Sequence, residues 1–174
     1  MECSTDYTGR KYSLNIDFIL NGIEVHSECD EGTRLIDLLR TKFNLTGAKK
    51  CCNLGKCGAC SVILNGELVK SCLIPAFKAQ GSEIKTIEGI FNTENYLDFI
   101  NGFKEAGLHN CGICDSGKIL AIETLLSVNQ RPSKEEIYSA LEGIICRCTS
   151  PSFLEKGIFS VIEHRRKRLH GTQG

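Results

Sequence analysis

Four cysteines from position 52 to position 72 stand at a spacing suited to metal ligation. They follow the pattern C-x4-C-x2-C…C, which is typical of plant-type [2Fe–2S] proteins: Cys52, Cys57, Cys60 and Cys72. Glycines at positions 55 and 58 let the backbone adopt positive φ and bring N–H groups close to the sulfurs. Zinc sites usually show two C-x2–4-C pairs, which this triplet does not match. The spacing therefore predicts a [2Fe–2S] cluster, with structural zinc as the alternative.

A second set of four cysteines lies in the other half of the chain. It has the form C-x2-C…C-x-C and comprises Cys111, Cys114, Cys146 and Cys148. Both pairs fall at junctions between predicted helices, where positive helix N-termini favour thiolates over thiols. This spacing is less specific than the first. Zinc held by four thiolates and a C-x2-C redox disulfide are the alternatives to an iron–sulfur cluster.

The composition limits the classes of protein that can carry these sites. The 174 residues suggest one or two domains, and a formal net charge of zero gives no reason to expect a nucleic acid or an acidic membrane as partner. The sequence contains no run of 18 apolar residues, so no membrane span is expected. Its N-terminal segment is not apolar, so no secretory signal is expected. Eleven cysteines, clustered in motifs, then indicate metal ligation in a reducing cytoplasm rather than a disulfide framework.

The first half of the chain shows the alternating pattern of strands. A strand is expected from Tyr12 to Leu20, a turn at Asn21-Gly22, and a return strand to Cys29. Thr33 is expected to cap a helix that ends near Asn44.

A second hairpin is predicted to separate the third and fourth cysteines of the first set. Its turn is Asn65-Gly66, so the chain leaves the site after Cys60 and returns at Cys72. A last short strand is expected from Glu83 to Ile87.

The second half shows helical periodicity. The hydrophobic period changes from two to 3.6 near positions 88–92, which predicts two domains, 1–89 and 90–174. Thr93 is expected to cap the first of four helices, with Tyr96, Ile100 and Phe103 facing inward.

Three more helices complete the predicted second domain. One follows Cys114, one begins with a capping box formed by Ser133 and Glu136, and the last begins at Pro151. The basic segment 163–168 is expected to be a solvated helix end, with partner docking as the alternative.

The two motifs together resemble the iron–sulfur subunit of the molybdenum hydroxylases, the xanthine dehydrogenase/aldehyde oxidase family. The resemblance runs from Tyr12 to Ile162 and depends on GAKKCCNLGKCGAC…SCL followed by HNCGIC…CRCT. It implies an α+β fold, with an N-terminal β-grasp plant-type ferredoxin-like domain and a C-terminal four-helix bundle domain. Each domain is then expected to carry one [2Fe–2S] cluster.

The resemblance also implies a function and partners. The chain is expected to transfer electrons within a molybdopterin-dependent hydroxylase or dehydrogenase, with a molybdopterin-binding large subunit and an FAD-binding subunit as partners. Electrons would leave molybdenum through the cluster of the second cysteine set, and then pass through the first set to FAD or another acceptor. The substrate site is expected on a partner, and Asn110 is expected to contact the pterin.

Several residues depart from the family pattern. Asn110 replaces the usual Gln, and Asp115-Ser116-Gly117 replaces Thr-Pro-Gly, so that an inward Asp115 carboxylate would lower the potential of a neighbouring cluster. The segments 143–145 and 149–151 also differ from the family. Cys51 replaces a usual Gly, while Cys52 keeps the x4 spacing of a ligand.

The alternative function is a stand-alone two-cluster ferredoxin-like carrier or redox sensor. It predicts a well-solvated face around Asn110 and Pro151. An exposed apolar patch at that face would instead favour a subunit of a larger complex, because such patches mark interfaces.

Overall fold

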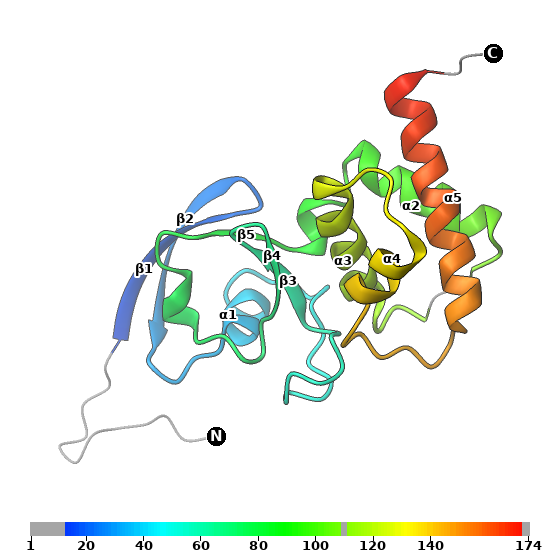
Figure 1. The fold of residues 1–174 in the computed structure, drawn as a ribbon. Coiled ribbons are helices and arrows are strands. Elements are labelled where there is room, and N and C mark those ends of the chain that lie inside the picture. The colour runs from blue at the N-terminus through cyan, green and yellow to red at the C-terminus, as the bar shows by residue number, and fades with distance from the viewer. Residues whose placement is uncertain (1–12, 109–110, 172–174) are drawn as a thin grey trace.

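The computed structural model describes residues 13–108 and 111–171. Figure 1 shows a sheet with one helix lying beside a group of helices. The strands are β1 (Ser13–Leu20), β2 (Ile23–Asp30), β3 (Ser61–Leu64), β4 (Glu67–Lys70) and β5 (Glu83–Lys85). Their order in the sheet is β2-β1-β5-β3-β4, in which β5 runs parallel to β1 and antiparallel to β3. The sheet is therefore mixed, and its central strand comes last in the sequence.

Both predicted hairpin turns are confirmed. Asn21 and Gly22 have φ of 53° and 83°, and Asn65 and Gly66 have φ of 50° and 86°. These left-handed angles match the right-handed twist of the flanking strands. The last strand is shorter than predicted, because the chain turns into the short 3-10 helix η2 (Ile87–Gly89) after Thr86.

The helix of the first half, α1 (Leu35–Thr41), begins later than predicted. The prediction that Thr33 caps it is wrong: the N-cap is Arg34, and no side chain caps the helix. The reason is tertiary, since the Thr33 carbonyl accepts the N–H of Ala76, at the start of the 3-10 helix η1 (Ala76–Ala79), and an isolated bridge joins Arg34 to Pro75. The helix buries a leucine-rich face against the sheet: Leu35, Leu38 and Leu39 lie with Ile16, Phe18, Leu20, Val62 and Ile84.

Four helices form the second half: α2 (Glu94–Glu105), α3 (Asp115–Val128), α4 (Lys134–Ala140) and α5 (Pro151–His170). The Thr93 cap and the capping box of Ser133 and Glu136 are confirmed. Ile100 was expected to face inward, and this is wrong, because its side chain is 46% exposed. Phe99 is fully buried instead, and it contacts the Phe103 ring edge-on at 5.9 Å.

The basic segment of α5 is not simply a solvated helix end. Arg165 is buried and forms ion pairs with Asp98 of α2 at 3.3 Å and Glu123 of α3 at 2.8 Å. Arg168 also pairs with Asp98, at 2.7 Å. Two of the basic side chains therefore fasten α5 to its neighbours, so the expectation of full solvation is wrong for them.

The two halves meet at α3. This helix contacts β3 and β4, and a small apolar cluster of Ile63, Ile90 and Leu120 joins them. In the described residues, no helix is both long enough and apolar enough to cross a membrane.

Candidate metal centres

The β3–β4 hairpin brings two cysteines of the first set together. Cys60 directly precedes β3, and Cys72 follows β4 by two residues. Ser71 holds the two ends side by side, because its N–H and its hydroxyl both donate to the Cys60 carbonyl, at 3.2 and 2.6 Å. Both cysteines are buried, in contact with Ile36 of α1.

A tight loop presents the other two cysteines. The Sγ of Cys52 accepts the backbone N–H groups of Leu54 and Cys57, both at 3.4 Å. These donors lower the pKa of the Cys52 thiol to about 6. The predicted left-handed glycines are confirmed, with φ of 72° at Gly55 and 71° at Gly58. The loop is therefore wound so that its N–H groups favour a thiolate.

The first set thus divides into two pairs, Cys52 with Cys57 and Cys60 with Cys72. Burial raises the pKa of Cys60 to about 11, against an opposing backbone hydrogen bond from Cys72 and together with the Cys72 thiol. Burial disfavours a free thiolate, but a metal cation that replaces the thiol proton compensates the negative charge of the sulfur. Two pairs fit a [2Fe–2S] cluster, in which each iron takes two protein ligands. Cys51 is exposed.

The second set comes together at the ends of helices. The sulfurs of Cys114, Cys146 and Cys148 all lie within 4.8 Å of one another, and those of Cys146 and Cys148 are 3.5 Å apart. Cys114 is the N-cap of α3, and Cys148 lies three residues before α5. Cys111 lies beside Cys148, since its backbone N–H and its thiol both help to lower the pKa of the Cys148 thiol. Three sulfurs of the second set therefore converge, and Cys111 is close to one of them.

The thiols of the second set have contrasting environments. Burial raises the pKa of Cys114 to about 12. Hydrogen bonds from Cys146, then from the Cys111 N–H, lower the pKa of Cys148 to about 7. One buried and one polarised thiol resemble the arrangement in the first set, so the donor chemistry of both sets fits a thiolate-bound cluster.

Two charged side chains stand beside the second set. Lys118 is 1% exposed, and its Nζ lies 3.1 Å from Asp115 Oδ1. Asp115 Oδ2 also accepts the N–H of Gly112, at 2.9 Å. Sequence reasoning considered Asp115 alone and missed Lys118. The available signal was a lysine directly before Ile119-Leu120 in an otherwise apolar helix turn.

The two cysteine sets touch through the backbone. The N–H of Ile145, next to Cys146, donates to the carbonyl of Cys57 at 3.0 Å. A Cβ on Gly117 would lie 2.5 Å from the carbonyl oxygen of Gly58. Ser116 adds a hydrogen bond to the Gly47 carbonyl, at 2.7 Å. The first turn of α3 is thus packed tightly against the loop that carries the first set.

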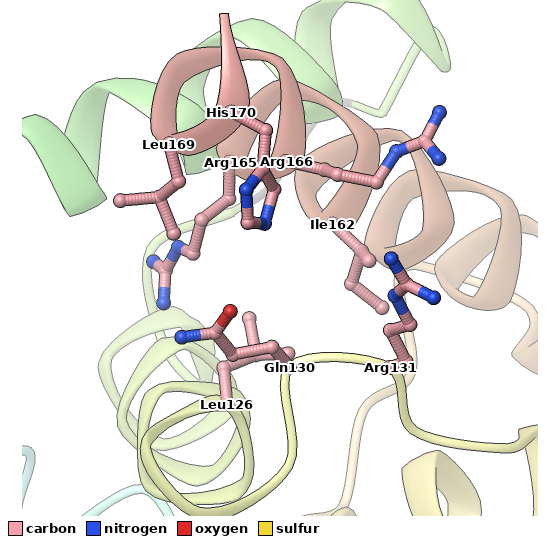
Figure 2. A pocket seen from close by; sticks show the side chains of 8 residues that line it. All are labelled: Leu126, Gln130, Arg131, Ile162, Arg165, Arg166, Leu169 and His170. Carbon is pink, nitrogen blue, oxygen red and sulfur yellow. The ribbon is translucent and has the colours of Figure 1, made fainter.

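Asn110, the expected pterin contact, lies outside the described residues. A pocket between the C-terminal parts of α3 and α5 is lined by apolar and basic side chains, including Leu126, Arg131 and His170 (Figure 2). It offers about 20 Å³ of space for water, and no cysteine lines it. This volume holds a water molecule or two but no organic substrate.

Comparison with known proteins places both halves in iron–sulfur families. The 2Fe-2S iron-sulfur cluster binding domain family matches residues 18–85, and the [2Fe-2S] binding domain family matches residues 86–158. A probable xanthine dehydrogenase subunit of Bacillus subtilis is 43% identical, over 67% of this chain and 67% of its own length.

A second relative and a solved structure agree with these matches. The nicotinate dehydrogenase small FeS subunit of Eubacterium barkeri is 41% identical over 78% of this chain and 87% of its own length. In the crystal structure of quinoline 2-oxidoreductase from Pseudomonas putida 86, one chain superposes with a TM-score of 0.81 at 30% identity, covering 88% of this chain and 97% of that one. The chain described here therefore belongs to the iron–sulfur subunits of the molybdenum hydroxylases, a family of oxidoreductase complexes.

Proposed function

We propose that this chain relays electrons between a molybdenum centre and FAD, or another acceptor, through two [2Fe–2S] clusters. The observation that carries the proposal is the direct contact between the two cysteine sets. The hydrogen bond from Ile145 N–H to the Cys57 carbonyl joins the backbone next to one set to a residue of the other. Two redox centres held this close have a short path for one electron at a time.

The proposal assigns all eight cysteines as ligands. Cys52, Cys57, Cys60 and Cys72 hold the cluster of domain 1–89, a β-grasp ferredoxin-like unit. Cys111, Cys114, Cys146 and Cys148 hold the cluster of domain 90–174, a four-helix bundle. The pairing of the first four cysteines and the convergence of three sulfurs of the second set, with Cys111 beside Cys148, support this assignment.

The clusters supply one-electron redox chemistry when they are bound. The chain positions and shields them. The N–H groups of Leu54 and Cys57 stabilise negative charge on the Cys52 sulfur, and burial of Cys60 and Cys114 keeps water from those sulfurs. The α3 N-terminus orients Cys114, while the hairpin fixes the distance between Cys60 and Cys72.

The surface near the second set supports a partner subunit. Ile113, Ile145 and Phe153 are 50%, 56% and 51% exposed, and each lies in or next to the segments that carry these cysteines. Exposed apolar side chains at this position favour a covered interface over the solvated face that a stand-alone carrier requires. We infer that this face meets a molybdopterin-binding large subunit, with Asn110 at the pterin and with the substrate site on that subunit.

The first set is proposed to face the next acceptor. Leu54 and Leu73, which flank Cys52 and Cys72, are 67% and 58% exposed. An FAD-binding subunit at this side would complete a path in the order molybdenum, second cluster, first cluster and flavin.

A redox and spectroscopic measurement on the full chain tests the proposal. Low-temperature EPR of the dithionite-reduced protein should show two distinct S = 1/2 signals, with iron and sulfide for two clusters per chain. A single EPR signal together with bound zinc would contradict the proposed relay, because only one cluster would be present. A second test is co-purification of the tagged chain with a large molybdopterin-containing subunit, whereas a stable monomer with full activity would favour the stand-alone carrier.

A further inference from the structure

Lys118 is a buried cation placed one turn inside helix α3. Its side chain is 1% exposed, and its backbone N–H donates to the carbonyl of Cys114 at 3.0 Å. Its ammonium pairs with Asp115 Oδ1 at 3.1 Å. Both residues of the pair therefore lie in the turn that begins at Cys114.

This position is unfavourable for a lysine unless negative charge faces it. Burying an ammonium is costly, and the N-terminal turn of a helix carries partial positive charge that repels it. An apolar residue such as the neighbouring Ile119 or Leu120 would fill the same space without that cost. Asp115 supplies one such charge through Oδ1, while its Oδ2 accepts the Gly112 N–H at 2.9 Å.

The cysteines of the second set also favour the charged form of Lys118. Burial by itself would lower the pKa of Lys118, but Asp115, followed by Cys114 and Cys146, outweighs burial and raises the pKa above its ordinary value. The ammonium contacts Asp115, which directly follows Cys114 and binds the Gly112 N–H between Cys111 and Cys114, so the cation lies beside the segment that carries two proposed ligands.

We propose that the Lys118 ammonium raises the reduction potential of the second cluster, and that Asp115 both holds this cation in place and limits its effect. The inference depends on the proposed function, because it requires a cluster at the second cysteine set. Two ferric ions, two sulfides and four thiolates sum to a negative charge that grows when an electron is added. A fixed, buried cation beside them stabilises the reduced form more than the oxidised form.

Redox titration of the full chain, followed by EPR, tests the role of Lys118. In the Lys118→Gln variant, the ratio of reduced to oxidised second cluster at a fixed potential should fall at least tenfold, a shift of about 59 mV for one electron. The first cluster should keep its potential. Lys118→Arg keeps the charge and should stay close to the unaltered protein. Lys104→Gln, a change at an exposed site on α2, is the matched control and should shift neither cluster.

Asp115 provides an independent test of the opposite sign. Asp115→Asn keeps an oxygen for the Gly112 N–H but removes the charge, so the potential should rise. The double variant Asp115→Asn/Lys118→Gln should lie between the two single variants. The double variant also remains informative if Lys118→Gln alone fails to fold, because it removes both charges of the pair together. Its potential can then be compared with that of Asp115→Asn.

The outcomes separate this inference from the proposed function. Two EPR signals with unchanged potentials in Lys118→Gln and Asp115→Asn would overturn the electrostatic role and leave the relay standing. A merely structural pair would lower thermal stability in both variants without moving the potential. If the unaltered chain itself showed no second signal, the proposed function would fail first.

Discussion

The two cysteine sets show two ways of building the same kind of site. The first set occupies positions 52–72, and its geometry comes from one loop and one hairpin joined by Ser71. The second set spans positions 111–148, and its sulfurs meet only because α3, α4 and α5 bring their ends together. One site is therefore largely a local product of the chain, and the other depends on the packing of a whole core.

This difference predicts different sensitivities. The first set should better tolerate damage to the helical core, since Cys60 and Cys72 flank the β3–β4 hairpin and contact α1. The second set should lose its geometry when α3 or α5 shifts, because Cys114 and Cys148 belong to their N-terminal ends. The backbone contact between Ile145 and Cys57 is where damage can pass from one site to the other.

The largest effect is expected from removing one ligand in each set. Cys60→Ser should abolish one EPR signal and Cys114→Ser the other, each with loss of roughly half of the iron, because a [2Fe–2S] cluster needs four ligands. Cys29→Ser is the matched control, since Cys29 is also buried but lies in the sheet core. Loss of both signals in either variant would show that the sites are not independent.

The ion pairs that fasten α5 should matter to the second site more than to the first. Arg165→Met leaves Asp98 buried without one of its partners and should lower the free energy of unfolding by about 3 kcal/mol. In urea, the second EPR signal should then disappear before the first. Glu163→Gln removes the shared partner of Arg166 and Lys167, two pairs at the surface, and should change stability far less. Simultaneous loss of both signals would contradict the proposed division.

Gly58 tests the contact between the sites. A Cβ there would lie 2.6 Å from the Gly143 carbonyl oxygen, and φ is +71°. Gly107 has nearly the same φ, +69°, but open space around its Cβ position, so it separates strain from crowding. We expect Gly58→Ala to cost about 2 kcal/mol more than Gly107→Ala, measured by chemical denaturation, because an overpacked contact must shift. Equal costs would mean that the two halves separate easily at this point.

The smallest effect concerns the capping box of α4, the helix that leads to Cys146. Ser133→Ala should lower stability by about 1 kcal/mol through loss of the cap, with the first site unaffected. The Ser133 N–H, followed by Asn129, lowers the pKa of Glu136 in the folded state. The contribution of the Glu136 carboxylate to folding stability is therefore complete above the ordinary pKa of a glutamate. It is lost as the pH falls through the lowered pKa of the folded state.

Unfolding curves measured at neutral and acidic pH test whether the Glu136 contribution to stability is lost at low pH. Glu136→Gln should reduce the difference in stability between the two pH values. An unchanged difference would mean that the capping box does not couple to pH.

The sequence by itself determined the features that depend on neighbours along the chain. The two Asn-Gly turns, the caps at Thr93 and Ser133, and the left-handed glycines of the first loop all follow from local backbone chemistry. The spacing of the first cysteine set belongs to the same class, because a loop and a hairpin set the distances between its members. The positions of these elements were therefore predictable without knowledge of the packing.

Only the tertiary structure decided which residues are buried against distant partners. Thr33 does not cap α1 because its carbonyl accepts the N–H of Ala76. Phe99 rather than Ile100 is buried in the core because α2 packs against α5. The ion pairs of Arg165 and the burial of Lys118 beside Cys114 and Cys146 depend on helices that are far apart in the sequence. Periodicity shows that a helix has an apolar face, but the charge of a side chain on that face becomes meaningful only when the packing places its partners.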